Sequence, residues 1–332
     1  MLLYILRRLA YSIVVLLVAS FITFWGMRIA FNPLTQIRAE AAGTHRSAAD
    51  TQKLLDAQRA RLHMNETLFH QWWRWFTAFL HGDMGVSIRT HDSVSSMITH
   101  ALSPTLQLLF WGSILSLALA IGVGVYSAVR QYSVADYTFT GLSYIGIAMP
   151  PFAFAILASA YLVTWPVHRF HWHNPVFYTI GLHSTGVTGI NLDYFRHLAL
   201  PVLTLTVQGI ASWSRFLRSS MLDVMNADYV RTAKAKGVPR RKVVFKHAFR
   251  NALIPFTTVV ALDTAFLLGG LIITETFYTI PGMGLLFFNS LEASDAPVLL
   301  AWFVITAAAV LVINLFVDLF YSYLDPRIRV TA

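Results

Sequence analysis

Four histidines near the middle of the chain have the residue type and close spacing of a candidate metal site: His168, His171, His173 and His183. Imidazole nitrogen is a usual ligand of zinc and other transition metals. Such sites commonly add Cys or carboxylate ligands, but the chain contains no Cys and this cluster contains no acidic residue. A cluster of this kind is more often solvated or interfacial. We therefore expect no bound metal, and a metal site stays the alternative.

Catalytic motifs are missing from the sequence. It has no G-x-x-x-x-G-K-[ST] phosphate-binding loop and no H-E-x-x-H zinc helix, so this chain is not expected to hydrolyse ATP itself. Ser, His and Asp are all present, but no nucleophile elbow marks an activated Ser. We predict no catalytic residue and no cofactor bound by this chain. The missing motifs remove positive evidence for an intramembrane enzyme without excluding one.

Three carboxylates lie within or beside strongly apolar stretches: Asp263, Glu275 and Asp318. A charged side chain at the centre of a membrane helix costs about 2.5–3.5 kcal/mol, so it usually faces protein or water. Asp263 is therefore a candidate for a polar translocation path, with packing against a partner side chain as an equal alternative. Glu275 and Asp318 are expected to be mainly structural.

The elements that must position these residues are membrane helices, because the chain is unusually apolar. Of its 332 residues, 56% are hydrophobic and 12% charged, whereas charged residues make up about 25% of an ordinary soluble domain. About 20 apolar residues can span a bilayer as a helix, and the runs here are continuous rather than alternating, unlike those of a β-barrel. We predict an all-α integral membrane protein with six spans, at Leu9–Phe31, Pro104–Val129, Phe139–Val163, Leu198–Leu217, Ile254–Thr274 and Val298–Tyr323.

Prolines punctuate these spans. Pro104, Pro201 and Pro297 are expected near helix starts, where a missing N–H costs nothing. Pro150 and Pro151 instead interrupt the third apolar run and should kink or break its helix. A tolerated kink packed against neighbouring helices is the favoured interpretation. A bend that widens a central translocation path is the alternative.

Basic residues predict the orientation. The segment from Arg215 to Arg250 carries ten Arg or Lys residues against two Asp, whereas none lies between Glu275 and Val298. The positive-inside rule therefore places this segment and both termini in the cytoplasm. The net charge of +9 is mainly a topology signal and gives no reason to expect nucleic acid binding. Contact of the basic segment with anionic lipid stays open.

The segment 32–103, between the first two spans, is predicted to be extracytoplasmic. Leu9–Phe31 is longer than the 7–15 residue apolar region of a cleaved signal peptide, so a retained anchor is expected. Trp72, Trp73 and Trp75 crowd one stretch of this outer segment. Such rings usually settle at the lipid headgroups, which predicts an interfacial helix. Stacking of the rings on a ligand is the alternative.

A basic, helix-forming block lies between the fourth and fifth spans. Asp228 suits a helix N-terminus, Gly237 can end that helix in a left-handed conformation, and Pro239 can start the next helix. Two short helices at an angle are predicted on the cytoplasmic face. Such a rigid element could transmit a push from a partner, and an amphipathic loop on anionic lipid is the alternative. The expected apolar stripe of the first helix is Tyr229, Val230 and Ala233.

The same block resembles the coupling motif of permease subunits of ATP-driven (ABC) importers, in the dipeptide/oligopeptide branch. It reads Asp228-Tyr-Val-Arg-Thr-Ala-Lys-Ala-Lys-Gly237 and continues with His247-Ala-Phe-Arg-Asn-Ala-Leu-Ile-Pro255. Met1–Arg8 resembles the amino terminus of the first (B-type) of the two permease subunits, while Asn32-Pro-Leu34 departs from the usual Pro-Gly-Asp-Pro. Further matching blocks follow in order along nearly the whole chain: Gly82–Ser87, Pro104–Leu106, Arg218–Leu222, Leu268–Gly270, Thr274–Thr276, Pro281–Gly284, Asn314–Tyr321 and Asp325–Arg329.

This resemblance implies a fold and a division of the chain. The fold is the six-helix permease fold of type I ABC importers, with an extracytoplasmic insertion between helices 1 and 2. The implied parts are an N-terminal tip and first helix (1–31), the extracytoplasmic segment (32–103), and a five-helix permease core (104–332) that contains a cytoplasmic coupling loop (218–253).

The resemblance also implies a transport subunit rather than an enzyme, forming the path for di- or oligopeptides. The implied partners are a sister permease subunit, two ATP-binding subunits that carry ATP and Mg, an extracytoplasmic solute-binding protein, the peptide and membrane lipid. The implied location is the bacterial plasma (inner) membrane. Alternatives are the same machinery carrying glutathione, a nickel chelate or an oligosaccharide, and a secondary transporter.

Site residues follow from the matching positions. Pro150, Pro151 and Asp263 are the candidates for the translocation path, and no metal or cofactor site is expected. The residues expected to couple to the ATPase are Asp228, Tyr229, Arg231, Thr232, Ala233, Ala235, Gly237, His247, Arg250 and Asn251.

Overall fold

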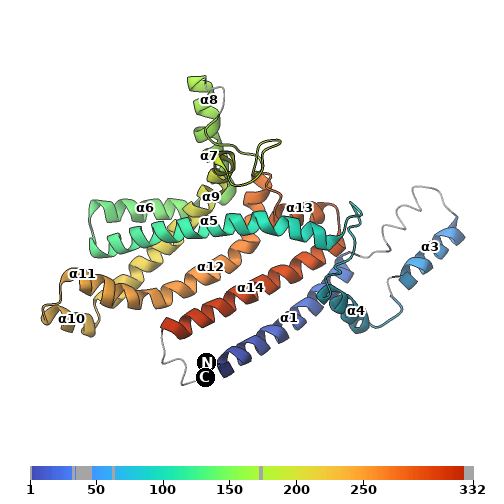
Figure 1. The fold of residues 1–332 in the computed structure, drawn as a ribbon, viewed down its shortest axis with the longest axis horizontal. Helices are drawn as coiled ribbons and strands as arrows, with labels where there is room; N and C mark the ends of the chain where they lie inside the picture. Colours follow the sequence, from blue (N-terminus) through green and yellow to red (C-terminus); the bar gives the residue numbers. More distant parts are fainter. Residues whose placement is uncertain (1, 32–33, 35–46, 62–63, 172–174, 325–332) are drawn as a thin grey trace. The chain divides into compact units, whose positions relative to one another are not determined.

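The computed structural model describes residues 2–31, 34, 47–61, 64–171 and 175–324, and this part of the chain is mostly helical (Figure 1). Within it, the only β-structure is an isolated antiparallel bridge between Val86 and Ser93. The prediction of an all-α fold is therefore confirmed. The helices of the first half are α1 (Leu2–Ala30), α3 (Ala48–Arg61), α4 (Leu68–Leu80), α5 (Val94–Val129), α6 (Val134–Ala148), α7 (Pro151–Ser159), the π-helix η1 (Ala160–Thr164) and α8 (Trp165–Phe170). Those of the second half are α9 (Leu192–Met225), α10 (Asp228–Ala235), α11 (Arg240–Lys242), the π-helix η2 (Val243–Phe249), α12 (Arg250–Phe277), α13 (Met283–Glu292) and α14 (Ala296–Leu324).

These helices form two compact units. Unit 1 contains residues 101–285 and the end of α14 from Val312, and unit 2 contains residues 2–100 and 286–311. The candidate coupling and translocation residues all belong to unit 1. Unit 2 holds α1, α3 and α4.

Four stretches of helix in the described residues are long and apolar enough to cross a membrane: Ile5–Ala30, Val94–Val129, Pro151–Phe170 and Ala296–Phe316. An integral membrane protein is therefore confirmed. The helices α9 and α12 cover the predicted fourth and fifth spans, with 34 and 28 residues. Both are longer than a bilayer crossing requires, but they carry several charged side chains. Their crossing of the membrane stays a prediction.

The third predicted span is not one continuous helix. α6 ends at Ala148 and α7 begins at Pro151, while Pro150 is extended with φ −61° and ψ 147°. The break leaves the Met149 carbonyl without a helical partner, and the Gln208 side-chain amide of α9 donates to it at 2.8 Å. A neighbouring helix thus satisfies the backbone that the prolines free, as expected for a break tolerated inside a membrane bundle.

Two other prolines do not mark helix starts, contrary to the prediction. α5 begins at Val94 and α9 at Leu192, so Pro104 and Pro201 lie well inside long helices. The apolar windows begin near these prolines, but the helices continue outward through polar residues that hydropathy alone does not include. Pro297 is the second residue of α14 and fits the prediction.

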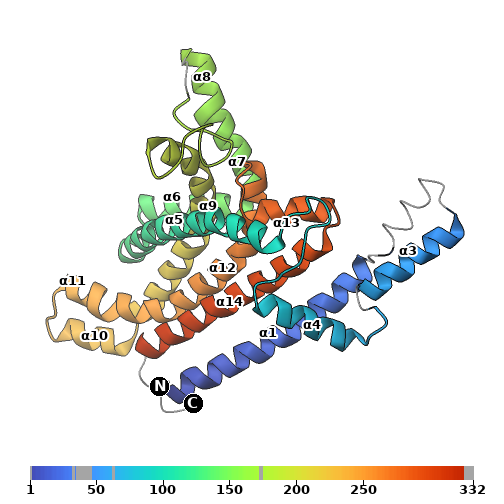
Figure 2. The ribbon, with the colours of Figure 1, turned by 45° about the vertical axis from the view of Figure 1, so that its right-hand side comes forward.

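Helix α9 is the centre of unit 1 and packs against α6, α7 and α12. Small residues let α5 approach it closely: a Cβ added at Gly209 would lie 2.6 Å from Ser116, and one at Gly124 would lie 2.9 Å from the Ser214 carbonyl. Within this unit, α10 and α11 lie where α9 ends and α12 begins, and both views show them away from α8 (Figure 2).

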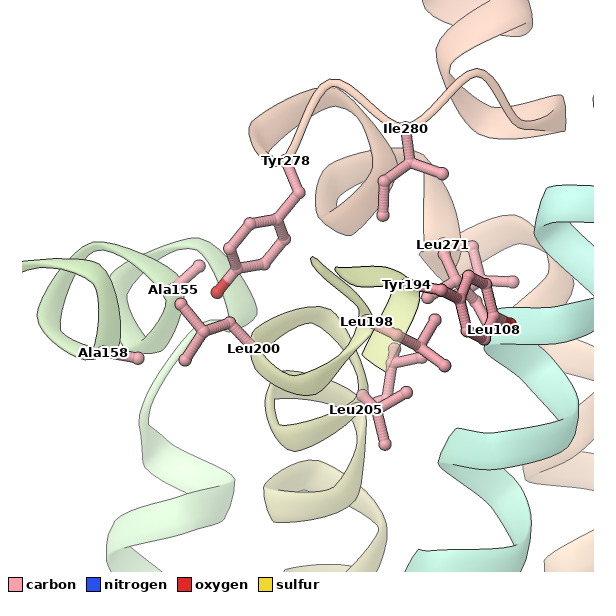
Figure 3. Close-up of a cluster of buried hydrophobic side chains, with 11 residues drawn as sticks. Leu108, Ala155, Ala158, Tyr194, Leu198, Leu200, Leu205, Leu271, Tyr278 and Ile280 are labelled. Carbon is pink, nitrogen blue, oxygen red and sulfur yellow. The ribbon is translucent and has the colours of Figure 1, made fainter. Parts of the chain in front are cut away.

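The core beside α7 gathers buried side chains from four helices and from the turn that follows α12 (Figure 3). The Tyr278 ring points toward Ala155 of α7 and Leu200 of α9, and its hydroxyl lies 3.1 Å from the Thr204 hydroxyl. Leu108 of α5 belongs to the same cluster. This core fixes the end of α12 against α9, α7 and α5.

Helix α4 of unit 2 is more deeply packed than an interfacial helix requires. Trp72 and Phe76 are buried in a cluster with Phe24 of α1 and Leu300 of α14. The Trp72 indole N–H donates to the Ser20 hydroxyl at 3.2 Å. Trp72 therefore serves as core, which leaves it unavailable to stack on a ligand. Trp73 is exposed and fits the predicted headgroup position.

Candidate functional site

The basic block between α9 and α12 begins with a short, well-defined helix. α9 ends at Met225, and α10 starts two residues after the cap Asn226. Asp228 occupies the first turn of α10, where a carboxylate interacts favourably with the helix dipole. Its carboxylate lies 3.7 Å from the Arg231 guanidinium, and both side chains are largely exposed. This pair contributes little to stability and leaves both groups accessible to a partner.

One face of α10 is packed against the rest of the block. Val230 and Ala233 form a buried cluster with Val243 of η2, and Val224 and Val238 pack against it. Tyr229 was expected on the same stripe, but 48% of it is exposed. Successive residues of a helix are 100° apart, so the buried face of α10 spans only Val230 and Ala233. Tyr229 lies beyond the edge of that face and is exposed. This cluster, which we call the apolar bed, holds α10 in place and leaves the opposite face of the helix exposed.

Gly237 ends α10 with a Schellman motif. The Val238 N–H donates to the Ala233 carbonyl at 3.2 Å, and the Gly237 N–H donates to the Lys234 carbonyl at 3.0 Å. Gly237 has φ +73°, a conformation that costs other residues energy. Val238 then packs onto the apolar bed, as the residue after a Schellman glycine commonly does. The predicted left-handed helix end is confirmed.

The second predicted short helix is not separate. Pro239 precedes α11 as expected, but α11 continues through the π-helix η2 directly into α12, and the residues at both junctions, Val243 and Arg250, are right-handed helical. No glycine or proline interrupts the chain between Pro239 and Pro255, so nothing stops the helix. A π-helical segment is rare and often marks a functional site. The block is thus one short helix, α10, braced against the start of a long one.

The positions predicted to couple to the ATPase divide into two groups in the structure. Ala233 is buried and His247 is half-buried, and the His247 carbonyl accepts a hydrogen bond from the Asn251 side-chain amide at 2.8 Å. Ala233 supports the surface from beneath, through its packing on Val243. The exposed members are Asp228, Tyr229, Arg231, Thr232, Ala235, Gly237, Arg250 and Asn251.

The translocation-path candidates are held by α9. The Asp263 carboxylate of α12 accepts hydrogen bonds from the Trp213 indole at 2.9 Å and from the Ser212 hydroxyl at 3.4 Å. Pro150 and Pro151 form the break between α6 and α7 described above. Asp263 is thus engaged by packed partners, which favours its structural interpretation. A path along these residues stays a prediction.

Glu275 of unit 1 has several hydrogen-bond partners, which could not be read from the sequence. It is fully buried. Its carboxylate accepts from the Thr105 hydroxyl of α5 at 2.6 Å and from the Gly284 and Leu285 N–H groups of α13 at 2.6 and 3.3 Å. The Thr105 hydroxyl also accepts from the Met283 N–H at 2.8 Å. We call Thr105, Glu275 and residues 282–285 the Glu275 node.

Other charged positions singled out in the sequence have separate surroundings. His168 lies in α8 and His171 follows it as a left-handed cap, while His173 is outside the described residues. His183 lies 3.9 Å from the Asp193 carboxylate. Among the residues that the structure describes, no group of three His, Cys, Asp or Glu could hold a metal ion. For Asp318, the structure gives the helix α14 and no side-chain position.

Comparison with known proteins gives matches over nearly the full chain. Residues 120–330 match the family of binding-protein-dependent transport system inner membrane components, and residues 1–109 match the N-terminal region of such membrane components. The oligopeptide transport system permease protein AppB of Bacillus subtilis is 36% identical over 98% of this chain and 99% of that protein. The dipeptide transport system permease protein DppB of Alkalihalophilus pseudofirmus is 35% identical over 99% of this chain and 100% of its own length. The oligopeptide transport system permease protein OppB of Mycobacterium tuberculosis is 33% identical over 99% of each chain.

Proposed function

Because this chain belongs to the family of binding-protein-dependent transport system inner membrane components, we propose that it is the permease subunit of an ATP-driven peptide importer. Peptide is the favoured solute because the relatives in Bacillus, Alkalihalophilus and Mycobacterium are named as oligopeptide or dipeptide permeases. In this role the chain lines the path and carries out no chemistry on the solute. The same machinery could carry another small solute chosen by its binding protein.

The proposed assembly pairs this chain with a sister permease and two ATP-binding subunits. An extracytoplasmic solute-binding protein delivers the peptide from the other side. The density of Arg and Lys between Arg215 and Arg250 supports a cytoplasmic position for α10 and α11. Both termini then also lie in the cytoplasm, on the same side of the membrane as α10 and α11.

The observation that carries the proposal is the construction of α10. Its inner face is fixed by Val230, Ala233 and Val243, and its outer face exposes Tyr229 and several charged groups. A helix of eight residues is too short to be stable alone, so this packing and the Gly237 turn must hold it. The chain thus keeps a small rigid element outside its apolar spans, which follows α9 directly and packs on η2, the π-helix that continues into α12.

This construction suits the transfer of movement from a nucleotide-driven partner. The exposed face of α10 would seat in a groove of one ATP-binding subunit. Closure of the ATP-binding pair would move α10, and its packing on Val243 would pass that movement to α12. The result is a two-state rearrangement between inward and outward openings, biased by nucleotide.

A pair of substitutions separates docking from folding. Ala235 is exposed on α10, whereas Ala233 is buried against Val243. We expect Ala235→Trp to leave the purified permease folded, while copurification of ATP-binding subunits and ATP-dependent peptide uptake fall at least tenfold, which corresponds to about 1.4 kcal/mol. Ala233→Trp should instead destabilise the permease itself, because it overpacks a buried site.

The matched control is Ala57→Trp, at an exposed position of α3. It should change neither the fold nor the copurification of ATP-binding subunits. The docking role is rejected if Ala235→Trp retains normal copurification and uptake.

A further inference from the structure

The turn between α5 and α6, residues 130–133, is tied to the α10–α11 region. α5 ends at Val129, and the carbonyl of that residue accepts a hydrogen bond from the Arg240 guanidinium of α11 at 3.3 Å. A cation at a helix C-terminus also complements the helix dipole. The sequence places this turn 111 residues from Arg240, so its spacing gave no reason to associate the two. The structure makes the turn a neighbour of the surface that α10 and α11 present.

An ion pair between the buried Asp136 of α6 and the half-buried Arg218 of α9 holds this turn against α9. Asp136 is 2% exposed, and both of its carboxylate oxygens accept from the Arg218 guanidinium at 2.8 Å. The same carboxylate accepts from the Tyr132 N–H at 3.0 Å, and the Ser133 hydroxyl accepts from the Asp136 N–H at 3.2 Å. The hydrogen bonds from Arg218 hold the pKa of the Asp136 carboxyl below its ordinary value. A two-pronged pair of this kind fixes direction as well as distance.

The residue that this network fixes is strained and exposed. Tyr132 has φ +62°, a conformation unfavourable for a bulky side chain, and it persists only where the surroundings over-determine it. Its side chain nevertheless points outward, with 70% of the residue exposed, and the next apolar residue, Val134, is 83% exposed. The Asp136–Arg218 ion pair and the strained backbone of Tyr132 thus hold the side chains of Tyr132 and Val134 away from the protein's own core.

We propose that the α5–α6 turn, through Tyr132 and Val134, is a second contact surface for the ATP-binding subunit that seats on α10. This inference rests on the proposed function, because it names a further part of the same interface. Continuity through the Arg240–Val129 hydrogen bond places both surfaces within reach of one partner. Movement of that partner would then reach α9 twice: through α10, and through the Asp136–Arg218 pair.

A protein partner fits the turn better than lipid does. Lipid headgroups are fluid and adapt to many conformations of an interfacial tyrosine, so a lipid contact gives no reason to fix one strained backbone. A groove on a folded partner fits only one conformation of the tyrosine. A turn that already holds this conformation before binding loses less conformational entropy when the partner binds. Tyr is also among the residues enriched at protein interfaces.

Site-specific photo-crosslinking in the assembled complex tests the inference. Tyr132, Tyr229 and Tyr161 are exposed tyrosines on the α5–α6 turn, on α10 and on η1. Each is replaced in turn by p-benzoyl-phenylalanine, and the crosslinked products are identified by mass spectrometry. We expect positions 132 and 229 to crosslink to an ATP-binding subunit and position 161 to give at least tenfold less of that product.

A second variant tests the role of the ion pair. Asp136→Asn is added to each photo-crosslinking variant. It should lower the yield of the crosslink from position 132 to the ATP-binding subunit several-fold, while the yield from position 229 stays within twofold. Restoring the pair in reversed order, with Asp136→Arg and Arg218→Asp together, should recover part of the yield at position 132.

The outcomes separate the two proposals. If position 229 crosslinks to the ATP-binding subunit while position 132 gives only lipid adducts or none, the second surface does not exist and the proposed function stands. If neither position reaches an ATP-binding subunit, both proposals fail.

Discussion

The α10 surface and the Glu275 node are built on opposite principles, although both lie in unit 1. The α10 surface carries its charges into solvent, where Asp228 and Arg231 are separated by 3.7 Å and largely exposed. The Glu275 node buries its carboxylate completely and satisfies it with two N–H groups and a hydroxyl. Charge kept in water is available to a partner, whereas a buried carboxylate with three hydrogen-bond donors fixes the polypeptide around it.

The glycines of the two regions show the same difference. A Cβ at Gly237 would meet open space, so that glycine is needed only for its positive φ. A Cβ at Gly282 would collide with the Glu275 carboxylate, and one at Gly284 would lie 2.5 Å from the Ile272 backbone. The node needs glycine for close approach. Substitutions should therefore affect stability in the node and partner binding on the α10 surface.

Removing the carboxylate of the node should have the largest effect on stability. Glu275→Ala leaves the Gly284 and Leu285 N–H groups and the Thr105 hydroxyl without their acceptor, and it opens a cavity. We expect the free energy of unfolding to fall by about 3–5 kcal/mol, measured by denaturant titration in mixed micelles. The control Asp223→Ala, at an exposed position of α9, should change it by less than about 0.5 kcal/mol. Equal effects of the two substitutions would contradict the contrast.

The two glycines give a sharper version of the same contrast. Gly284→Ala forces a Cβ against the Ile272 backbone and should lower the free energy of unfolding by about 3 kcal/mol, near the upper end for overpacking. Gly237→Ala meets no atoms and should cost about 1 kcal/mol, from its positive φ alone. The same denaturant titration ranks the two variants. A larger loss at Gly237 would mean that the α10 turn is packed against something within the chain itself.

The Asp136–Arg218 pair lies between these extremes and gives a pH dependence. Because the pKa of Asp136 is lowered in the folded state, its contribution to stability is fully present above the ordinary aspartate pKa of about 4 and is lost as the pH falls through the folded value. Asp136→Asn should therefore lower the free energy of unfolding by about 2 kcal/mol at neutral pH. The difference from the wild type should narrow as the pH falls below about 4. A difference independent of pH would show that the charge of Asp136 contributes nothing.

Sequence reasoning was strongest where structure follows from local chemistry. The apolar runs located the helices, and Gly237 and Pro239 marked the end of α10 and the start of α11, because dihedral preferences are properties of single residues. It was weaker where polar residues extend a helix, so that the starts of α5 and α9 were placed too late. The continuous passage from α11 into α12 was also missed, although the lack of any Gly or Pro between Pro239 and Pro255 was a signal for it.

The contacts between distant residues were beyond the sequence. Thr105 and Glu275 are 170 positions apart, and Asp136 and Arg218 are 82 apart. No local period links such residues, and only packing of the helices brings them together. Asp263 looked equally suited to a path and to a structural role, until the indole of Trp213 was found to donate to it. Trp213 and Asp263 are 50 residues apart, and this spacing gives no sign that their side chains meet.

The central claim is that a separate ATP-binding partner drives this chain through α10. The direct measurement is peptide accumulation in lipid vesicles, comparing the purified permease pair alone with the complete complex, each supplied with binding protein, ATP and Mg. We predict accumulation only with the complete complex, and none when Ala235→Trp prevents docking. Accumulation by the permease pair without any ATP-binding subunit would contradict the account.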